Sequence, residues 1–273
     1  MAANAVPGSD KAPLPLLDTT VPHSARVWNY WLGGKDNYPV DRVVGEQVRE
    51  VYPEIIDVAR ESRGFLARVV RFLAGEVGIR QFLDIGTGLP TAGNTHEVAQ
   101  SIAPDARVVY VDRDPLVLVH ARALLTSTPQ GVTAYVEADV RDPRTILAAA
   151  GDVLDFTRPI GLMMLGVLGN VADTDEACEI VTRLVDAVPA GSYLVVNDGT
   201  IASAEEAQGA IEAARRRKEA GDPYYPRTPA QIARYFDGLD LVEPGVVSTP
   251  LWRPEPGTSP RPIGSHGAVA RKA

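Results

Sequence analysis

Cysteine is nearly absent from the sequence: Cys178 is the single one in 273 residues. One cysteine excludes a disulfide within the chain and any metal site built from several thiolates. This composition suits a reducing, cytoplasmic setting. Residues 1–21 lack the basic start and apolar centre of a secretory signal, so we expect them to form a loose tail rich in proline and alanine.

Basic residues are too few for a general nucleic-acid binder. The chain has 27 Lys and Arg against 35 Asp and Glu, a formal net charge of −8, and neutralising phosphates requires clustered basic side chains. No apolar run reaches the roughly 18 residues that a membrane-spanning helix requires. We therefore expect a small-molecule partner rather than a nucleic acid or a membrane. The sequence leaves the oligomeric state open.

Helical patterns fill the part of the chain that follows the tail. Residues 24–32, 40–51 and 53–78 are predicted to be helices, and in the last of these the apolar side chains mostly recur at helical spacing. We therefore expect residues 22–78 to form an N-terminal helical cap.

From residue 79 onward, short apolar runs alternate with helical segments. The runs predict strands at residues 81–85, 106–111, 132–137, 160–165 and 192–196. Such alternation is typical of an α/β fold, with a parallel sheet covered by helices on both faces. Two later runs, 239–247 and 267–271, predict an antiparallel hairpin at a sheet edge. Residues 79–273 are thus expected to form one α/β domain.

The first predicted strand ends in the string D-I-G-T-G. In an open α/β sheet, ligands bind outside the carboxyl ends of the strands, so the residues at this end are candidate ligand contacts. Asp84 ends the strand, and Gly86 and Gly88 remove side chains where a ligand could approach the backbone. The alternative is a tight strand-to-helix turn that binds nothing.

Carboxylates also end the second and third predicted strands. Asp112 could accept hydrogen bonds from both hydroxyls of a ribose, although Asp112 or its neighbour Asp114 could instead cap the next helix. Asp139 could accept from the exocyclic amine of an adenine, while the backbone N–H of Val140 donates to the ring. The alternative for Asp139 is an ordinary loop residue.

The order of these acidic strand ends resembles the class I S-adenosylmethionine-dependent methyltransferases, over about residues 72–196 by architecture. The resemblance implies a Rossmann-like sheet, S-adenosylmethionine as cofactor, and a substrate-covering insertion at about residues 200–230. In that superfamily the glycine turn lies under the methionine part, the second-strand acid holds the ribose and the third-strand acid reads adenine. Carried over residue by residue, it implies cofactor contacts at Asp84, Gly86, Thr87, Gly88, Asp112, Arg113, Asp139 and Val140. One departure is Pro90, which stands where a third glycine is common.

Three longer strings carry a narrower resemblance. HSARVWNYWLGGKDNYPVDR at 23–42, DIGTGLPTAGNTHEVAQ at 84–100 and VVYVDRDPLVLVHARALL at 108–125 are similar to an actinobacterial family of S-adenosylmethionine-dependent methyltransferases with unassigned substrate, formerly a domain of unknown function. The similarity extends over about residues 22–273. It implies the fold and the cofactor but not the methyl acceptor.

Further residues are predicted to contact the cofactor or the substrate. Arg63 could bind the carboxylate of the cofactor through two hydrogen bonds, or it could simply face solvent. The aromatic faces of Trp28, Tyr30 and Trp31 could lie near a cationic sulfonium, or they could form the buried side of a docking helix.

The string after these aromatics, GGKDNY, could act as a lid over the pocket or as a plain loop between helices. Its Lys35 and Asp36, together with Tyr30, are candidate substrate contacts. Tyr224 and Tyr225 lie in the predicted insertion and are candidate substrate contacts as well. The basic run at residues 215–218 is expected to be mainly a solvated helix face.

Together these features predict methyl transfer from S-adenosylmethionine to a small-molecule acceptor on oxygen or nitrogen. No metal is expected, and no residue is identifiable as the catalytic base. One alternative is an NAD-dependent oxidoreductase, but its G-x-G-x-x-G motif would need glycine where Thr91 stands. Another is a non-catalytic regulator that binds S-adenosylmethionine.

Overall fold

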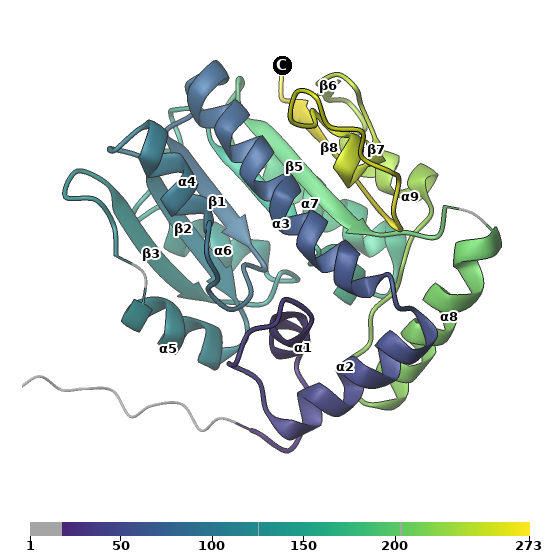
Figure 1. Ribbon diagram of the computed structural model, residues 1–273. Helices are drawn as coiled ribbons and strands as arrows, with labels where there is room; N and C mark the ends of the chain where they lie inside the picture. The colour runs from purple at the N-terminus through teal and green to yellow at the C-terminus, as the bar shows by residue number, and fades with distance from the viewer. Residues whose placement is uncertain (1–17, 125, 203) are drawn as a thin grey trace, which may run out of the picture.

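A single sheet lies at the centre of the protein. The computed structural model describes residues 18–124, 126–202 and 204–273, within which eight strands share this sheet (Figure 1). The strands are β1 (Gln81–Ile85), β2 (Arg107–Asp112), β3 (Val132–Glu137), β4 (Gly161–Leu165), β5 (Tyr193–Gly199), β6 (Asp240–Leu241), β7 (Val247–Ser248) and β8 (Ser265–Arg271). The predicted tail lies largely outside the described residues.

The five central strands are parallel and lie in the order β3-β2-β1-β4-β5. From β1 the chain adds strands on one side as far as β3, and then it returns to the other side at β4. The carboxyl ends of β1 and β4 therefore form the switch point where open α/β sheets bind ligands. The predicted α/β class with a mostly parallel sheet is confirmed.

The antiparallel closure of the sheet is confirmed, but the strand predicted over residues 239–247 is wrong as a continuous element. β8 pairs antiparallel with β5, and the two short strands β6 and β7 both pair with β8 on its outer side. The segment between β6 and β7 contains Pro244, which has no N–H to donate, and Gly245, whose φ is 81°. Both features interrupt a ladder of backbone hydrogen bonds.

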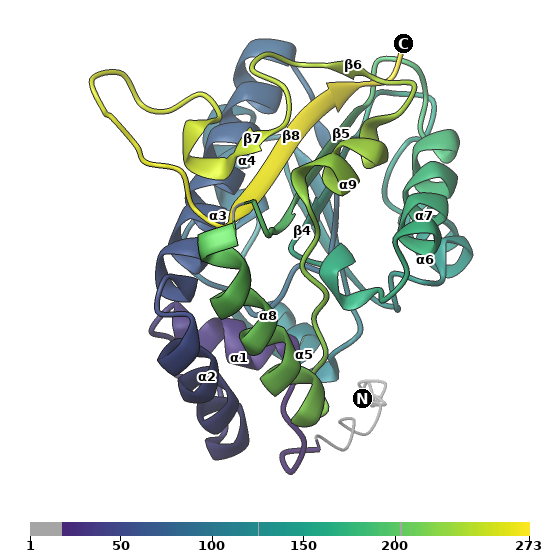
Figure 2. The ribbon, with the colours of Figure 1, turned by 90° about the vertical axis from the view of Figure 1, so that its right-hand side faces the viewer.

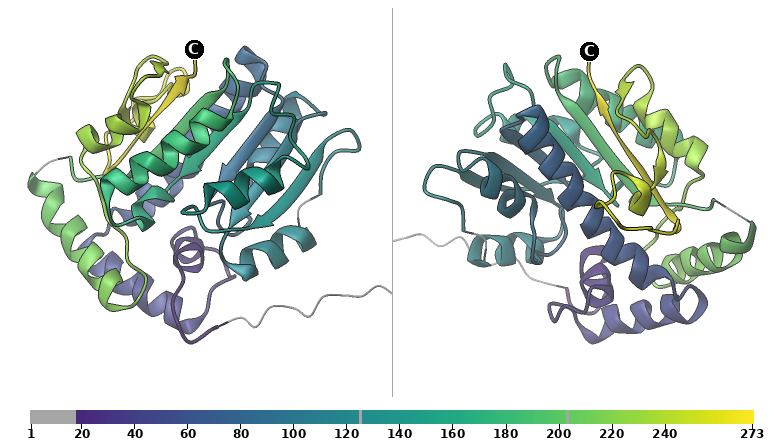
Figure 3. Two further views of the ribbon diagram at one scale, coloured as in Figure 1. Left: turned by 180° about the vertical axis from the view of Figure 1, so that it is seen from behind. Right: turned by 45° about the horizontal axis from the view of Figure 1, so that its top comes forward.

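Helices cover both faces of the sheet (Figure 3). On one face lie α3 (Ile55–Arg71), its π-helical extension η1 (Phe72–Val77) and α4 (Thr95–Ile102), which pack against Phe82, Val108 and Met163. The opposite face carries α6 (Pro143–Ala150), α7 (Thr174–Ala187), α9 (Pro229–Ala233) and η3 (Arg234–Phe236). Successive strand residues point to opposite faces, so Leu83 and Ile85 belong to this second layer.

The remaining helices gather at the carboxyl ends of the strands (Figures 1 and 2). They are α1 (Ser24–Trp31), α2 (Pro39–Val51), α5 (Pro115–Leu124) and α8 (Ala204–Glu219), with the short turn η2 (Leu168–Asn170) after β4. The turn η4 (Thr249–Leu251) lies against α3 instead, where Arg68 donates to the Thr249 carbonyl. α8 packs closely on α2, as Gly209 shows: a Cβ on this residue would lie 2.8 Å from the Val51 carbonyl oxygen. From here on we call α1, α2 and α8 the cap; this set differs from the cap predicted over residues 22–78, because α3 packs on the sheet and α8 comes from later in the chain. The domain division at residue 78 stays a prediction.

Candidate active site

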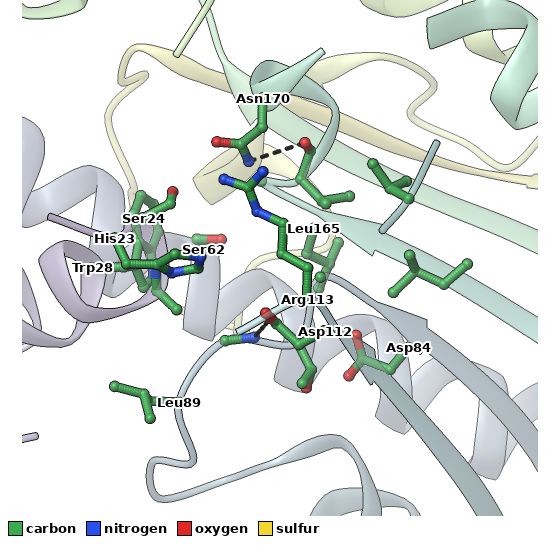
Figure 4. A pocket seen from close by; sticks show the side chains of 18 of the residues that line it. His23, Ser24, Trp28, Ser62, Asp84, Leu89, Asp112, Arg113, Leu165 and Asn170 are labelled. Carbon is green, nitrogen blue, oxygen red and sulfur yellow. Dashed lines mark hydrogen bonds between the residues drawn. The ribbon is translucent and has the colours of Figure 1, made fainter. Parts of the chain in front are cut away.

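A cleft of about 1160 Å³, partly open to solvent, lies between the cap and the carboxyl ends of β1, β2 and β4. Figure 4 shows Asp84 and Asp112 on one side of it, with His23, Ser24 and Trp28 facing them from α1 and its N-cap. Of the three aromatic side chains expected near the sulfonium, Trp28 lines this cleft, whereas Tyr30 and Trp31 do not. The nine residues predicted as further cofactor contacts all line it: Arg63, Asp84, Gly86, Thr87, Gly88, Asp112, Arg113, Asp139 and Val140. Of the predicted substrate contacts, Tyr224 alone does.

The glycine turn after β1 exposes backbone to the cleft. The N–H groups of Gly86 and Thr87 donate to the Val111 carbonyl at 2.8 and 3.2 Å, which fixes the turn against β2. Gly86 has a φ of 76°, and a Cβ there would overlap the side chain of Val167. Gly88 also has a positive φ, 66°, but a Cβ on it would extend into open space. The two glycines therefore differ: Gly86 makes room for Val167, whereas Gly88 leaves room in the cleft.

Asp112 is held in place by backbone groups. Its Oδ2 accepts from the N–H of Gly88 and its Oδ1 from the N–H of Asp114, both at 2.9 Å. Burial raises the pKa of Asp112, and these two hydrogen bonds act in the opposite direction. Each oxygen keeps a second lone pair, so this carboxylate can still accept hydrogen bonds from a ligand in the cleft.

Asp84 and Arg63 carry opposite charges and both line the cleft, with Asp84 on the same side as Asp112. Thr95 donates from Oγ1 to Asp84 Oδ2 at 2.6 Å, and burial raises the pKa of Asp84 to about 6. Arg63 donates from Nη2 to the Gly93 carbonyl at 2.9 Å, but its Nε is buried and has no partner among the described residues. Burial lowers the pKa of Arg63, which the charge of Asp84 partly offsets. A ligand that carries both an ammonium and a carboxylate would give Asp84 and Arg63 each a partner of opposite charge.

Asp139 is already engaged by two arginines. Arg141 donates to Asp139 Oδ1 from its backbone N–H at 2.9 Å and from Nη1 at 3.2 Å, and Arg113 Nη1 lies 3.7 Å from Oδ2. The interaction with Arg141 was not predicted from the sequence. An adenine amine would have to share this carboxylate with both guanidinium groups, so adenine recognition by Asp139 stays a prediction.

The other predicted substrate contacts lie away from the cleft. The hydroxyl of Tyr30 hydrogen-bonds Glu46, and its ring lies where a side chain on Gly45 would overlap it. The remaining three are arranged as follows: Lys35 is exposed, the Asp36 N–H donates to Asn29 Oδ1 at 3.1 Å, and the Tyr225 N–H donates to the Gly169 carbonyl at 2.7 Å. Contact between these four residues and a substrate stays a prediction that the cleft does not support.

Tyr224 is fixed in the wall of the cleft. Its ring lies between two glycines, because a Cβ on Gly169 would overlap the ring and one on Gly199 would lie 3.2 Å from it. Its hydroxyl donates to Asp198 Oδ1 and accepts from the Gly199 N–H, both at 2.9 Å. The insertion is thereby attached to the ends of β4 and β5. In the sequence, Gly169 and Gly199 were the residues that could have indicated a ring packed at this position.

Arg217 is a cleft residue that sequence analysis placed on a solvated helix face. It is buried, and its Nη2 lies 2.6 Å from Asp222 Oδ2 and donates to Ser24 Oγ at 3.0 Å. Its guanidinium also lies 4.9 Å from the centre of the Tyr224 ring. The prediction holds for its neighbour Arg215, which is exposed. Only tertiary packing distinguishes these two arginines.

The start of α1 is anchored over the cleft by buried charges. His23 donates its N–H to Asp41 Oδ1 at 2.9 Å, and its Nδ1 lies 3.0 Å from Asp114 Oδ2. Arg26 Nε lies 3.7 Å from Asp41 and 3.6 Å from Asp114. These contacts connect α1 to α2 and to Asp114, which lies two residues after the end of β2. Nothing in the sequence pattern indicated this role for His23.

Two further properties concern the described residues as a whole. Among residues 18–124, 126–202 and 204–273, no three His, Cys, Asp or Glu side chains gather as metal ligands. The helices of this same part of the chain are too short or too polar to span a bilayer.

Known proteins share both the sequence and the architecture of this chain. A crystal structure of a DUF574 family protein from Streptomyces avermitilis is 46% identical, with a TM-score of 0.88 over 94% of this chain and 99% of that one. A candidate methyltransferase from Thermobifida fusca is 43% identical, with a TM-score of 0.86 over 95% and 98% of the two chains. An O-methyltransferase family 2 protein from Planctomyces limnophilus, 16% identical with a TM-score of 0.52 over 90% and 65%, shares the fold.

A search among curated proteins found no match. The sequence model of a family described as S-adenosyl methyltransferase, in contrast, matches residues 10–273. That match covers the cap, the glycine turn and all three acidic strand ends. The chain therefore belongs to the S-adenosyl methyltransferase family, whose cofactor is S-adenosylmethionine.

Proposed function

We propose that this S-adenosylmethionine-dependent methyltransferase methylates an oxygen or nitrogen atom of a small-molecule acceptor. When bound, the cofactor supplies an electrophilic methyl group on a cationic sulfur, which becomes a neutral thioether as the acceptor gains the methyl group and loses a proton to water. The main task of the chain is to hold acceptor and methyl group in line. Membership of the family disfavours the nicotinamide alternative.

The charge pattern of the cleft carries the proposal for cofactor binding. Asp84 and Arg63, a buried carboxylate and a guanidinium with a free Nε, suit the ammonium and carboxylate of the amino-acid part. Asp112 suits the ribose hydroxyls, and the open space beside Gly88 lets the ligand approach the backbone. The cleft thus offers a complementary group for each polar end of the cofactor.

The cap supports an acceptor of small size. α1 lies across the cleft, where Ser24 and Trp28 form part of its lining. Ser24 is held by Arg217 of α8, so this cover is tied to the second half of the cap. A compact molecule can fit beneath such a cover, whereas a polymer would have to pass between its parts.

Binding of S-adenosylhomocysteine by Asp112→Asn tests the ribose assignment. We expect calorimetry to show a loss of roughly 1–3 kcal/mol, because a charged acceptor is removed. Asp105→Asn, an exposed change distant from the cleft, serves as the matched control and should bind as the wild type does. A folded Asp112→Asn protein with wild-type affinity would refute the assignment.

Transfer of a labelled methyl group tests the acceptor class. The enzyme is incubated with methyl-labelled S-adenosylmethionine and a bacterial extract, and the products are then separated by size. We expect label in the small-molecule fraction. Label confined to protein or nucleic acid would refute the proposed acceptor class, and absence of transfer to any fraction would favour the non-catalytic regulator.

A further inference from the structure

A second cavity adjoins the cofactor cleft on the side away from Asp112. It lies between the cap and the ends of β5 and β8 and spans about 600 Å³, a volume that includes open solvent at its mouth. Four residues line both spaces: Trp28, Gly166, Arg217 and Tyr224. A molecule in this second cavity would therefore lie against the same wall as a molecule in the cofactor cleft.

The lining of this cavity is largely apolar. Rings come from Trp28, Trp31, Tyr52 and Tyr224, and the side chains opposite are the small residues of one helix face together with branched aliphatics: Val48, Ile55, Val58, Ala210, Ala213 and Ala214. Alanines at positions i, i+3 and i+4 share a face of α8, and their short side chains leave the space beside the rings open. The cavity thus has the character of a site for an apolar, aromatic molecule.

Charge in this cavity is compensated. Among the described residues that line it, Arg217 alone is charged, and its guanidinium is paired with the buried carboxylate of Asp222 at 2.6 Å. An ionised ligand would lose its hydration here without gaining an unpaired counter-charge, which is costly. The ligand that fits is therefore uncharged.

One polar atom of the lining remains to be satisfied. Asn197 is buried, and its Nδ2 lies 3.2 Å from Ser62 Oγ and 3.3 Å from Ser265 Oγ. Its Oδ1 is also buried and has no hydrogen-bond partner among the described residues. A buried acceptor without a partner costs free energy, so a hydroxyl or N–H on the ligand would be favoured at this point. Because Ser62 lines the cofactor cleft, Asn197 lies beside the boundary between the two spaces.

We propose that this cavity is the methyl-acceptor site and that it takes an uncharged aromatic compound whose hydroxyl or N–H donates to Asn197 Oδ1. The inference rests on the proposed methyl-transfer function and narrows its substrate class. Placed in this way, the donor group of the acceptor lies next to the cleft that holds the methyl group, while the ring system lies among the aromatic and alanine side chains.

Binding of simple probes tests the site without requiring turnover. The probe is 2-naphthol, titrated by calorimetry into the enzyme saturated with S-adenosylhomocysteine. We expect 2-methoxynaphthalene, which lacks the donor, to bind about fivefold more weakly, and 2-naphthalenesulfonate to show no measurable binding. Equal binding of the sulfonate, or no binding of 2-naphthol, would overturn the proposal.

Two substitutions on α8 locate the probe. Ala214→Phe should fill the cavity and weaken 2-naphthol binding at least tenfold, whereas Ile211→Phe, on the exposed face of the same helix, should leave it unchanged. Ala214→Leu is the smaller replacement if the phenylalanine variant does not fold. Unchanged probe affinity in a folded Ala214 variant would refute the acceptor site.

Affinity for S-adenosylhomocysteine separates this inference from the function on which it rests. Every variant on α8 should keep wild-type affinity for that ligand. Failure of the wild type itself to bind it would refute the proposed function. Normal cofactor affinity together with probe binding that does not respond to Ala214 would refute the acceptor site alone.

Discussion

The titration of Asp84 makes cofactor affinity depend on pH. Burial raises the pKa of this carboxyl to about 6, and the opposing effects of Thr95 and Arg63 are smaller. If Asp84 faces the ammonium of the amino-acid part, as proposed, the ligand binds the ionised form. The ligand's own α-amino group stays protonated between pH 5 and 7, so the change in affinity over that range reports on the protein.

The expected size follows from the raised pKa. At pH 7 most Asp84 carboxyls are ionised, but at pH 5 roughly nine in ten are protonated and must lose the proton to bind. Affinity for S-adenosylhomocysteine should therefore fall about tenfold from pH 7 to pH 5, which corresponds to about 1.4 kcal/mol. The sign is fixed: binding favours the charged form, so affinity is lost as the pH falls through the pKa of the free enzyme.

Calorimetry of the wild type and of Asp84→Asn measures this effect. The variant can still accept from Thr95 but cannot ionise, so it should bind more weakly at pH 7 and should lose the tenfold component of the pH dependence. Titrations in two buffers of different ionisation enthalpy should also show nearly one proton released by the wild type at pH 5. Parallel pH profiles for the two proteins would refute the role given to Asp84.

Two pairs of substitutions test the remaining structural assignments. In urea unfolding, Gly86→Ala should destabilise the protein more than Gly88→Ala, because a Cβ on residue 86 would overlap the side chain of Val167. The cost at Gly88 is that of a positive φ, roughly 1–2 kcal/mol, and Gly88→Ala should instead weaken S-adenosylhomocysteine binding. Equal stability and equal binding of the two variants would contradict this distinction. Arg217→Ala should destabilise the fold by about 3–5 kcal/mol because Asp222 is left buried and unpaired, while Arg215→Ala should change the stability by less than about 0.5 kcal/mol. Similar losses for both arginines would show that the buried pair contributes little.

The sequence was sufficient to predict that Asp84, Asp112 and Asp139 line one cleft, because parallel strands end at one edge of a sheet. Apolar runs with clear ends located β1, β2 and β3, and the topology then placed the residues that follow each of them together. Asp84 and Asp112 could be found in this way because local chain order determines their positions. The same reasoning cannot tell which groups already occupy a carboxylate, as the two arginines at Asp139 show.

Long-range contacts set the features that the sequence did not reveal. Arg217 has the same local pattern as Arg215, yet only Arg217 meets Asp222 and Ser24. The end of the sheet differs: residues 239–247 were predicted to form one strand, but Pro244 and Gly245 within that segment divide it into β6 and β7. For Arg217 the deciding partners lie in other elements, so a pattern within α8 cannot identify them, whereas the residues that break the last predicted strand stand within that segment.

The cap links these observations to the choice of acceptor. Its halves come from distant parts of the chain, α1 and α2 from before the sheet and α8 from between β5 and β6, and they meet through the Gly209 contact and the bond from Arg217 to Ser24. In the proposed arrangement the cofactor contacts cluster mainly at the strand ends, whereas much of the acceptor lining comes from the cap. Substitutions of Ala210, Ala213 and Ala214, which line the second cavity and not the cleft, should therefore alter which acceptor binds and leave cofactor binding intact.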